Sequence, residues 1–264
     1  MTHTFKSLLI TTVLTLPSAF GAAELHVTAA AAGPHSAEIA AVAVARHLVA
    51  TPEGMRRKVD QLVRSGQKEK AVELLEEFAN HPDATLKDIR SAGWSISILG
   101  GGDEKAVVLF ERAANHPDAT PEYIFDAASG MYDLGPSFYL RVAELLEKSA
   151  NLPDAAPVDI QNAAYGLYSL GVDFYARAAE LFEKSATHPD ATPDDIQSAA
   201  YGSWQLGQKD KAAELFEKSA NLPDVTPVNI QNAVRGLRSI AAKCREGSAE
   251  RARYNALADA IAAR

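Results

Sequence analysis

Apolar residues recur along most of this chain at the spacing of amphipathic helices. In the segment from 192 to 207, Ile196, Ala199, Ala200 and Leu206 share one face of a helix. The threonine at 192 suits the N-cap of that helix, the proline at 193 suits its first position, and the glycine at 207 suits its end. A second amphipathic pattern covers 209–220. The two patterns together predict a pair of helices joined by a short loop.

This helix-pair pattern repeats every 34 to 36 residues. A proline followed by an aspartate marks each unit, at spacings of 35, 36, 36 and 34: Pro82, Pro117, Pro153, Pro189 and Pro223. An isoleucine stands seven residues after each of these prolines, and a glycine stands eighteen residues after each of the first four. Such a repeat predicts a solenoid, in which each helix pair buries its apolar face against its neighbours.

The repeat domain is expected over 36–264. Its full units are expected at about 52–85, 86–120, 121–156, 157–192 and 193–226, with degenerate caps at 36–51 and 227–264. Terminal units of a solenoid differ from the others because one of their faces meets water.

Glycines interrupt the first helix of four units, at Gly130, Gly166, Gly202 and Gly236. A glycine inside a helix costs ~1 kcal/mol relative to alanine. We therefore expect these glycines to mark places where a neighbouring helix approaches closely.

The first 23 residues have the pattern of a secretory signal peptide. One lysine precedes an apolar run from Leu8 to Leu16, and Pro17 and several small residues follow it. This run is shorter than the ~20 residues that span a bilayer, so no stable membrane span is expected after cleavage. An uncleaved interfacial anchor is the alternative. The short signal is typical of bacteria and predicts a periplasmic or secreted protein, with a linker over 24–35.

The small and aromatic residues of the repeat also resemble a known family. Ala212 and Phe216 in a second helix have counterparts in Ala106 and Phe110 and in Ala178 and Phe182. With the isoleucine and alanines at 196, 199 and 200, this pattern resembles the tetratricopeptide repeat (TPR) family over roughly 37–260. The related Sel1-like repeat, also a helix pair, is the alternative. The resemblance implies an all-α, right-handed superhelical solenoid of antiparallel helix pairs, in which the first helices line the concave side.

One face of the first helices carries the candidate binding residues. Counting from the isoleucine of each unit, positions +1, +5 and +8 lie together outside the core stripe. The candidates on this face are Arg56, Arg90, Trp94, Phe125, Tyr132, Gln161, Tyr165, Tyr168, Gln197, Tyr201, Trp204, Gln231, Arg235 and Arg238. Tyrosine, tryptophan and arginine dominate binding hot spots. We expect the glutamine amides to bond the main chain of an extended peptide and the arginines to hold a carboxylate. The alternative is that the aromatic residues only pack between units.

The opposite face, on the second helices, is expected to be solvated. It carries glutamate and lysine pairs at i,i+4 spacing: Glu144 and Lys148, Glu180 and Lys184, Glu214 and Lys218. Such pairs contribute only ~0.2–0.5 kcal/mol each.

Composition and motifs argue against several kinds of chemistry. With 26 basic and 34 acidic residues the net charge is 26 − 34 = −8, which argues against nucleic acid as a partner. The single cysteine, Cys244, excludes a disulfide scaffold and is expected to be a small buried hydrophobic residue. The sequence holds no nucleotide-binding, zinc-protease or hydrolase motif. Histidines at 47, 81, 116 and 188 recur with the units, and helices stacked ~10 Å apart keep them from sharing a metal. No catalytic residue, metal site or cofactor is expected.

These observations favour a non-enzymatic protein–protein interaction module that binds a peptide or protein in its concave groove. One alternative is binding of cell-wall glycan or regulation of envelope enzymes, since aromatic rings can stack on sugars. The other alternative is a structural spacer or a secreted effector.

Overall fold

The structure is a computed structural model that describes residues 52–263. The predicted signal peptide over 1–23, the linker over 24–35, the cap over 36–51 and His47 lie outside the described residues. They stay predictions.

The described residues form twelve α-helices and two 3₁₀ turns, with no strand between 52 and 263. In chain order these are α2 (Pro52–Arg64), α3 (Lys68–Ala79), α4 (Leu86–Leu99), α5 (Asp103–Ala114), α6 (Pro121–Tyr132), η1 (Pro136–Phe138), α7 (Tyr139–Ala150), α8 (Pro157–Ser169), η2 (Val172–Phe174), α9 (Tyr175–Ala186), α10 (Pro193–Gln205), α11 (Lys209–Ala220), α12 (Pro227–Lys243) and α13 (Ala249–Ala262). The predicted all-α fold of antiparallel helix pairs is confirmed.

The chain divides into two compact units, of which residues 52–67 and 68–263 are described. The first contains α2, an amphipathic helix with Met55, Val59 and Leu62 buried on one face. The second contains all the remaining helices. The helices α2 and α3, which the sequence assigns to one repeat, fall on opposite sides of this division, and each unit is described by itself.

The first helices begin at residues that suit a helix N-terminus. Thr192 accepts a hydrogen bond from the amide of Asp195, whose carboxylate accepts the amide of Thr192 in return. The same reciprocal capping box is present at Thr85 and Thr226. Prolines occupy the first position of α6, α8, α10 and α12, where the missing amide proton is not needed. The predicted roles of Thr192 and Pro193 are confirmed.

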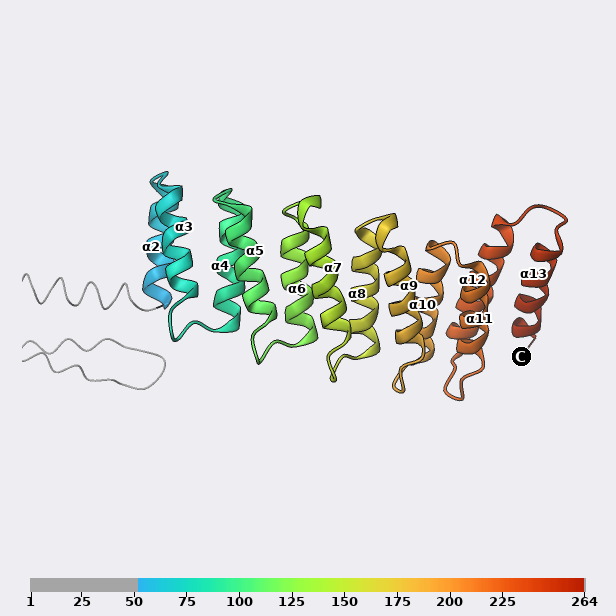
Figure 1. The fold of residues 1–264 in the computed structure, drawn as a ribbon. Coiled ribbons are helices and arrows are strands. Elements are labelled where there is room, and N and C mark those ends of the chain that lie inside the picture. The colour runs from blue at the N-terminus through green and yellow to red at the C-terminus, as the bar shows by residue number, and fades with distance from the viewer. Residues whose placement is uncertain (1–51, 264) are drawn as a thin grey trace, which may run out of the picture. The chain divides into compact units, whose positions relative to one another are not determined.

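Helix pairs in the unit 68–263 follow one another in a row (Figure 1). Each first helix packs most extensively on the second helix that follows it, as in α8 with α9 and α10 with α11. Each second helix also packs on the next first helix, and successive first helices, such as α8 and α10, touch directly. A seam between units therefore joins one first and one second helix to the next first helix.

An aromatic ring crosses each of three seams into a gap left by a glycine. A Cβ atom added at Gly202 would lie 2.3 Å from Cζ of Phe182, and one added at Gly236 would lie 2.3 Å from Cζ of Phe216. The same contact at Gly130 would be 2.5 Å from Phe110. These phenylalanines are fully buried. The expected close approach is confirmed, and the group that approaches is a ring from the preceding second helix.

The lysines of the second helices make different contacts from those expected. Lys148 Nζ donates to the backbone oxygen of Ala114 at 2.8 Å, and Lys184 Nζ donates to that of Ala150 at 2.7 Å. The last carbonyl groups of a helix lack partners within the helix and attract a cation, so each lysine caps the preceding second helix. The expected i,i+4 pairs with Glu144 and Glu180 are not among the ion pairs of the described residues.

The last helix pair is longer than the others and is held by a polar cluster. The Tyr254 hydroxyl of α13 donates to Asp210 of α11 at 2.8 Å, and Arg253 pairs with the same carboxylate. These donors lower the pKa of Asp210 below its ordinary value of 3.8. Cys244 is buried after α12 and burial raises its thiol pKa, which confirms the expected buried position.

The glycine gaps give a first prediction. Gly202→Ala forces a methyl group against the buried Phe182 ring, and overpacking of this kind costs about 1–3 kcal/mol. The gain in helix propensity returns only about 1 kcal/mol, so a net loss of stability is expected in urea unfolding. The matched control is Gly166→Ala, where the Cβ atom would meet the flexible methyl groups of Leu146 at 2.8 Å. A Gly202→Ala chain as stable as the control contradicts a rigid ring contact.

A second prediction concerns acid. Because the folded pKa of Asp210 is lowered, its contacts stabilise the fold above the ordinary pKa of 3.8 and are lost as pH falls through the folded pKa. The protection factors of the α13 amides, which are corrected for the intrinsic slowing of exchange in acid, should therefore fall on acidification below about pH 4. Asp210→Asn should remove part of this pH dependence, whereas Asp259→Asn, a change on α13 that keeps the Asp210 contacts, should retain it. Equal pH dependence in the wild type and Asp210→Asn would refute the role of this carboxylate.

Candidate functional site

The glutamines at position +1 lie inside the seams in two units. Gln161 and Gln197 are 6% and 4% exposed. The Gln161 amide donates to Ser185 Oγ at 2.9 Å and to the backbone oxygen of Asp195 at 3.0 Å. Gln197 donates to Ser219 Oγ at 3.2 Å and to the backbone oxygen of Asn229 at 2.8 Å. The expectation that these amides face a ligand is wrong, because each bonds a buried serine of its own unit and a backbone oxygen of the next unit. Gln231, in the last first helix, is exposed.

The aromatic residues at position +5 pack onto the phenylalanine of their own second helix. Trp94 meets Phe110 edge to face, with ring centroids 5.7 Å apart. Tyr165 meets Phe182 at 4.8 Å, and Tyr201 meets Phe216 at 4.9 Å, in the same geometry.

The tyrosines of these pairs also bond across the seam. Tyr165 donates to the backbone oxygen of Ser198 at 3.0 Å, and its burial raises its pKa. Tyr201 donates to the backbone oxygen of Asn232. The rings of these side chains therefore pack within their own unit, and the two tyrosines join it to the next unit through their hydroxyl groups; all three side chains remain partly exposed.

Two further tyrosines on the predicted face stack near the 3₁₀ turns. Tyr132 stacks on Tyr139 with centroids 5.2 Å apart, and Tyr168 stacks on Tyr175 at 5.1 Å. Burial and the neighbouring tyrosine raise the pKa of Tyr139 and of Tyr175. Trp204 is half-buried on α10, and the described residues show no ring contact for it.

The predicted arginines differ in their surroundings. Arg90 is half-buried, pairs with Asp126 of α6 and lies over the Tyr123 ring, 5.2 Å from its centroid. It therefore joins two units of the repeat. Arg56 is exposed on α2, in the separately described unit 52–67. Arg238 is exposed and lies 3.3 Å from Asp259 of α13.

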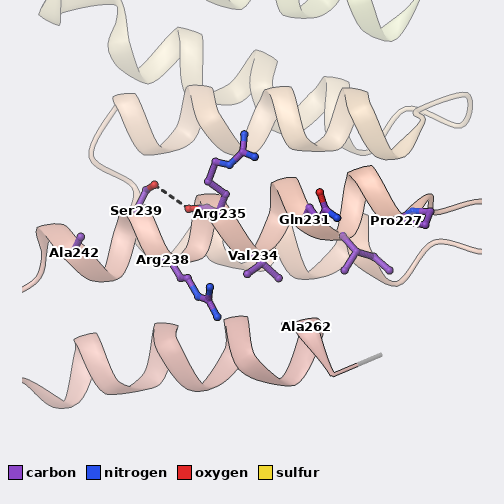
Figure 2. A pocket seen from close by; sticks show the side chains of 9 residues that line it. Pro227, Gln231, Val234, Arg235, Arg238, Ser239, Ala242 and Ala262 are labelled. Carbon is purple, nitrogen blue, oxygen red and sulfur yellow. Dashed lines mark hydrogen bonds between the residues drawn. The ribbon is translucent and has the colours of Figure 1, made fainter.

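An open hollow lies on the surface beside α12. It has a volume of about 820 Å³ and is lined by Gln231, Val234, Arg235, Arg238 and Ala262, among others. Figure 2 shows that Arg235 extends from α12 away from α13, whereas Arg238 extends toward α13. Arg235 is exposed, and the described residues offer it no ion pair. The hollow therefore presents two guanidinium groups, one on each side of the helix.

A second, smaller hollow lies between α6 and α8. It measures about 320 Å³ and is lined by the predicted residues Phe125, Tyr132 and Tyr165. Its walls also include residues that the sequence analysis did not select: Ser129, Asp133, Val142, Leu146 and Asn162. A signal for them exists in the repeat, since Ser129 and Leu146 stand in columns that hold aromatic rings in other units.

The helix pairs and their seams place this chain among known repeat architectures. The pairs recur every 34 to 36 residues, are antiparallel and bury alternate small and aromatic side chains. The described residues form a solenoid of antiparallel helix pairs, as the resemblance to the TPR family implies.

No family model matches the sequence, and no curated protein is similar to it. Solved structures similar to this chain include residues 41 to the end of MamA from Desulfovibrio magneticus RS-1, at 17% identity, 66% coverage of this chain and 97% of that chain, with a TM-score of 0.38. YrrB, described as a TPR protein with an unusual peptide-binding site, matches at 13% identity, 74% and 95% coverage and a TM-score of 0.39. The C-terminal part of a TPR repeat-containing protein from Cytophaga hutchinsonii matches at 13% identity, 78% and 79% coverage and a TM-score of 0.43. Similarity at this level carries no function over to this chain.

Three histidines that recur with the units have structural contacts. The Nδ1 atoms of His81, His116 and His188 accept the backbone amides of Asp83, Asp118 and Asp190 in the turns after the second helices. Between 52 and 263, no three histidine, cysteine, aspartate or glutamate side chains are placed to hold a metal ion. Over the same range, none of the helices combines the length and the apolar character needed to cross a bilayer.

The glutamine column gives a third prediction. Gln161→Ala and Gln197→Ala each remove two buried hydrogen bonds, which costs about 1–3 kcal/mol of unfolding free energy. Gln231→Ala removes the same amide from an exposed position, where a change within about 0.5 kcal/mol is expected. Urea unfolding measures the free energy of unfolding of the three variants, which carry the same substitution at position +1 of three first helices. Equal losses at all three positions would rule out the buried network as the cause.

Proposed function

We propose that this chain is a non-enzymatic scaffold that binds an extended segment of a partner protein along the exposed face of its first helices. Within the unit 68–263, the two hollows on this face are the places where such a segment can insert side chains. The carrying observation is the hollow at α12, where Arg235 and Arg238 are exposed and Arg235 has no acidic partner among the described residues. An acidic stretch of the partner fits these guanidinium groups.

Preformed shape supports binding by such a surface. The seams between units are held by buried rings and buried amides, so the first helices are ordered before any partner arrives. A preorganised surface loses less conformational entropy on binding than a flexible one. The glycan alternative draws no support from a specific contact, because Tyr132 and Tyr168 already stack on one side against other tyrosines.

We also propose that the mature chain acts in the periplasm or outside the cell. The support is the signal-peptide pattern of residues 1–23. The lone buried cysteine is compatible with an oxidising compartment, since it leaves no exposed thiol at Cys244.

A peptide-display selection against the mature chain tests the proposed function and is the fourth prediction. Selected peptides should be rich in aspartate and glutamate, and Arg235→Gln with Arg238→Gln should weaken their binding by about tenfold or more, since charge-assisted hydrogen bonds contribute ~1.5–3 kcal/mol each. Binding should also weaken as salt is raised.

The matched control is Arg245→Gln, which removes one exposed positive charge outside the hollow. It should leave binding unchanged. Circular dichroism checks that every variant remains helical. Selected peptides that bind the double arginine variant as tightly as the wild type would refute this assignment of the α12 surface.

A further inference from the structure

The hollow between α6 and α8 lies where the repeat loses an aromatic pair. In three other units, the first helix at position +5 and its own second helix hold two rings in edge-to-face contact: Trp94 with Phe110, Tyr165 with Phe182, and Tyr201 with Phe216. The unit 121–156 has Ser129 and Leu146 at these two positions. Both changes are from a large ring to a smaller side chain, and the hollow of about 320 Å³ lies at this place.

The surrounding structure keeps this space from closing. The helices α7 and α8 already pack on each other here, since a Cβ atom at Gly166 would be 2.8 Å from Cδ1 of Leu146. Tyr165, on the far wall, is held by its ring contact with Phe182 and its hydrogen bond to Ser198. The walls are thus fixed by the neighbouring seams.

The lining is apolar within and polar at its edge. Val142 and Leu146 are buried, and Phe125, Tyr132 and Tyr165 contribute aromatic rings. The Ser129 hydroxyl donates to the backbone oxygen of Phe125 in its own helix at 3.0 Å. Rings on several walls favour an aromatic occupant, because aromatic side chains attract one another edge to face.

The charge at the edge of the hollow is negative. Asp133 is the one charged residue in the lining described, it is exposed, and no ion pair is recorded for it between 52 and 263. A cation attached close to the ring would therefore be complementary. The volume suits one side chain, since an engineered apolar cavity of ~150 Å³ already takes benzene and drug-sized ligands fill ~300–1,000 Å³.

We propose that this hollow is a specificity pocket for an aromatic side chain with an adjacent basic group, supplied by the bound segment of the partner. The proposal rests on the proposed function for its biological ligand, but the pocket can be measured by itself. Together with the arginines at α12, it implies a partner segment with an aromatic–basic element and a separate acidic stretch.

Small probes test the pocket without a partner, as the fifth prediction. Phenethylamine carries a ring and an ammonium group, cyclohexylethylamine replaces the ring by an aliphatic one, and phenylpropionate reverses the charge. In NMR titrations of the labelled mature chain, phenethylamine should shift the methyl signals of Val142 and Leu146 saturably. Cyclohexylethylamine and phenylpropionate should bind more weakly. Asp133→Asn should lower the affinity for phenethylamine by up to about fivefold, as expected for the loss of one exposed charge.

Variants that restore the repeat pattern give the decisive comparison. Ser129→Tyr with Leu146→Phe should fill the hollow with the same pair of rings that three other units have. The affinity for the probe should then fall by about tenfold or more. The control Gln205→Tyr adds a ring at an exposed position of α10 and should leave binding unchanged. Conversely, Tyr201→Ser with Phe216→Leu should open a second site, seen at the methyl groups of the introduced leucine. If this chain does not fold, the filled variant still tests the pocket.

The outcomes separate this inference from the proposed function. Absence of saturable binding to the wild type, equal binding of the aliphatic amine, or undiminished binding in the filled variant would each overturn the pocket. Displayed peptides that depend on Arg235 and Arg238 but bind the filled variant normally would overturn the pocket and leave the scaffold in place. Saturable probe binding, with no selected peptide that depends on Arg235 and Arg238, would support the pocket and refute the proposed function at α12.

Discussion

The unit 68–263 depends on rings from α5, α9 and α11 that each reach the next first helix at a glycine. Phe182 against Gly202 and Phe216 against Gly236 are the closest of these contacts. In a solenoid each unit contacts only its neighbours, so stability is close to a sum of unit and seam contributions. A seam that brings a ring onto bare backbone buries a large apolar area in a small space. This explains why glycine recurs inside helices where propensity alone would select alanine.

Polar side chains also hold the seams together. As a result, several residues that the sequence assigns to the binding face of the first helices are not available to a ligand. Gln161 and Gln197 each donate to a buried serine of their own unit and to a backbone oxygen of the next unit, so the two units share one buried polar network. The tyrosines at +5 do the same with their hydroxyl groups. Residues with the composition of a binding hot spot are therefore largely engaged in joining units. Open positions remain where a seam is interrupted or where the series ends.

Those two kinds of position are chemically different. At the seam of α6 and α8, smaller side chains leave an apolar hollow with one carboxylate at its edge. At α12 no further first helix of the described chain covers the face, and its column of glutamine and arginine residues stays exposed. The proposed partner segment would therefore meet different chemistry at the two places.

The helix pairs, their caps and the position of close contacts follow from the sequence alone, because they depend on local spacing. The structural roles of Thr192, Pro193 and Gly202 are predictable from residue type and position in the repeat. The sequence could not decide which members of a column are covered, since Gln161 and Gln231 occupy the same position and differ only in having a following unit. Lys148 likewise had a plausible partner one turn away, but the carbonyl groups of the preceding second helix lie within its reach only after the units stack. Burial, and with it the candidate site, is a property of neighbours that are distant in the chain, and only the tertiary structure brings them together.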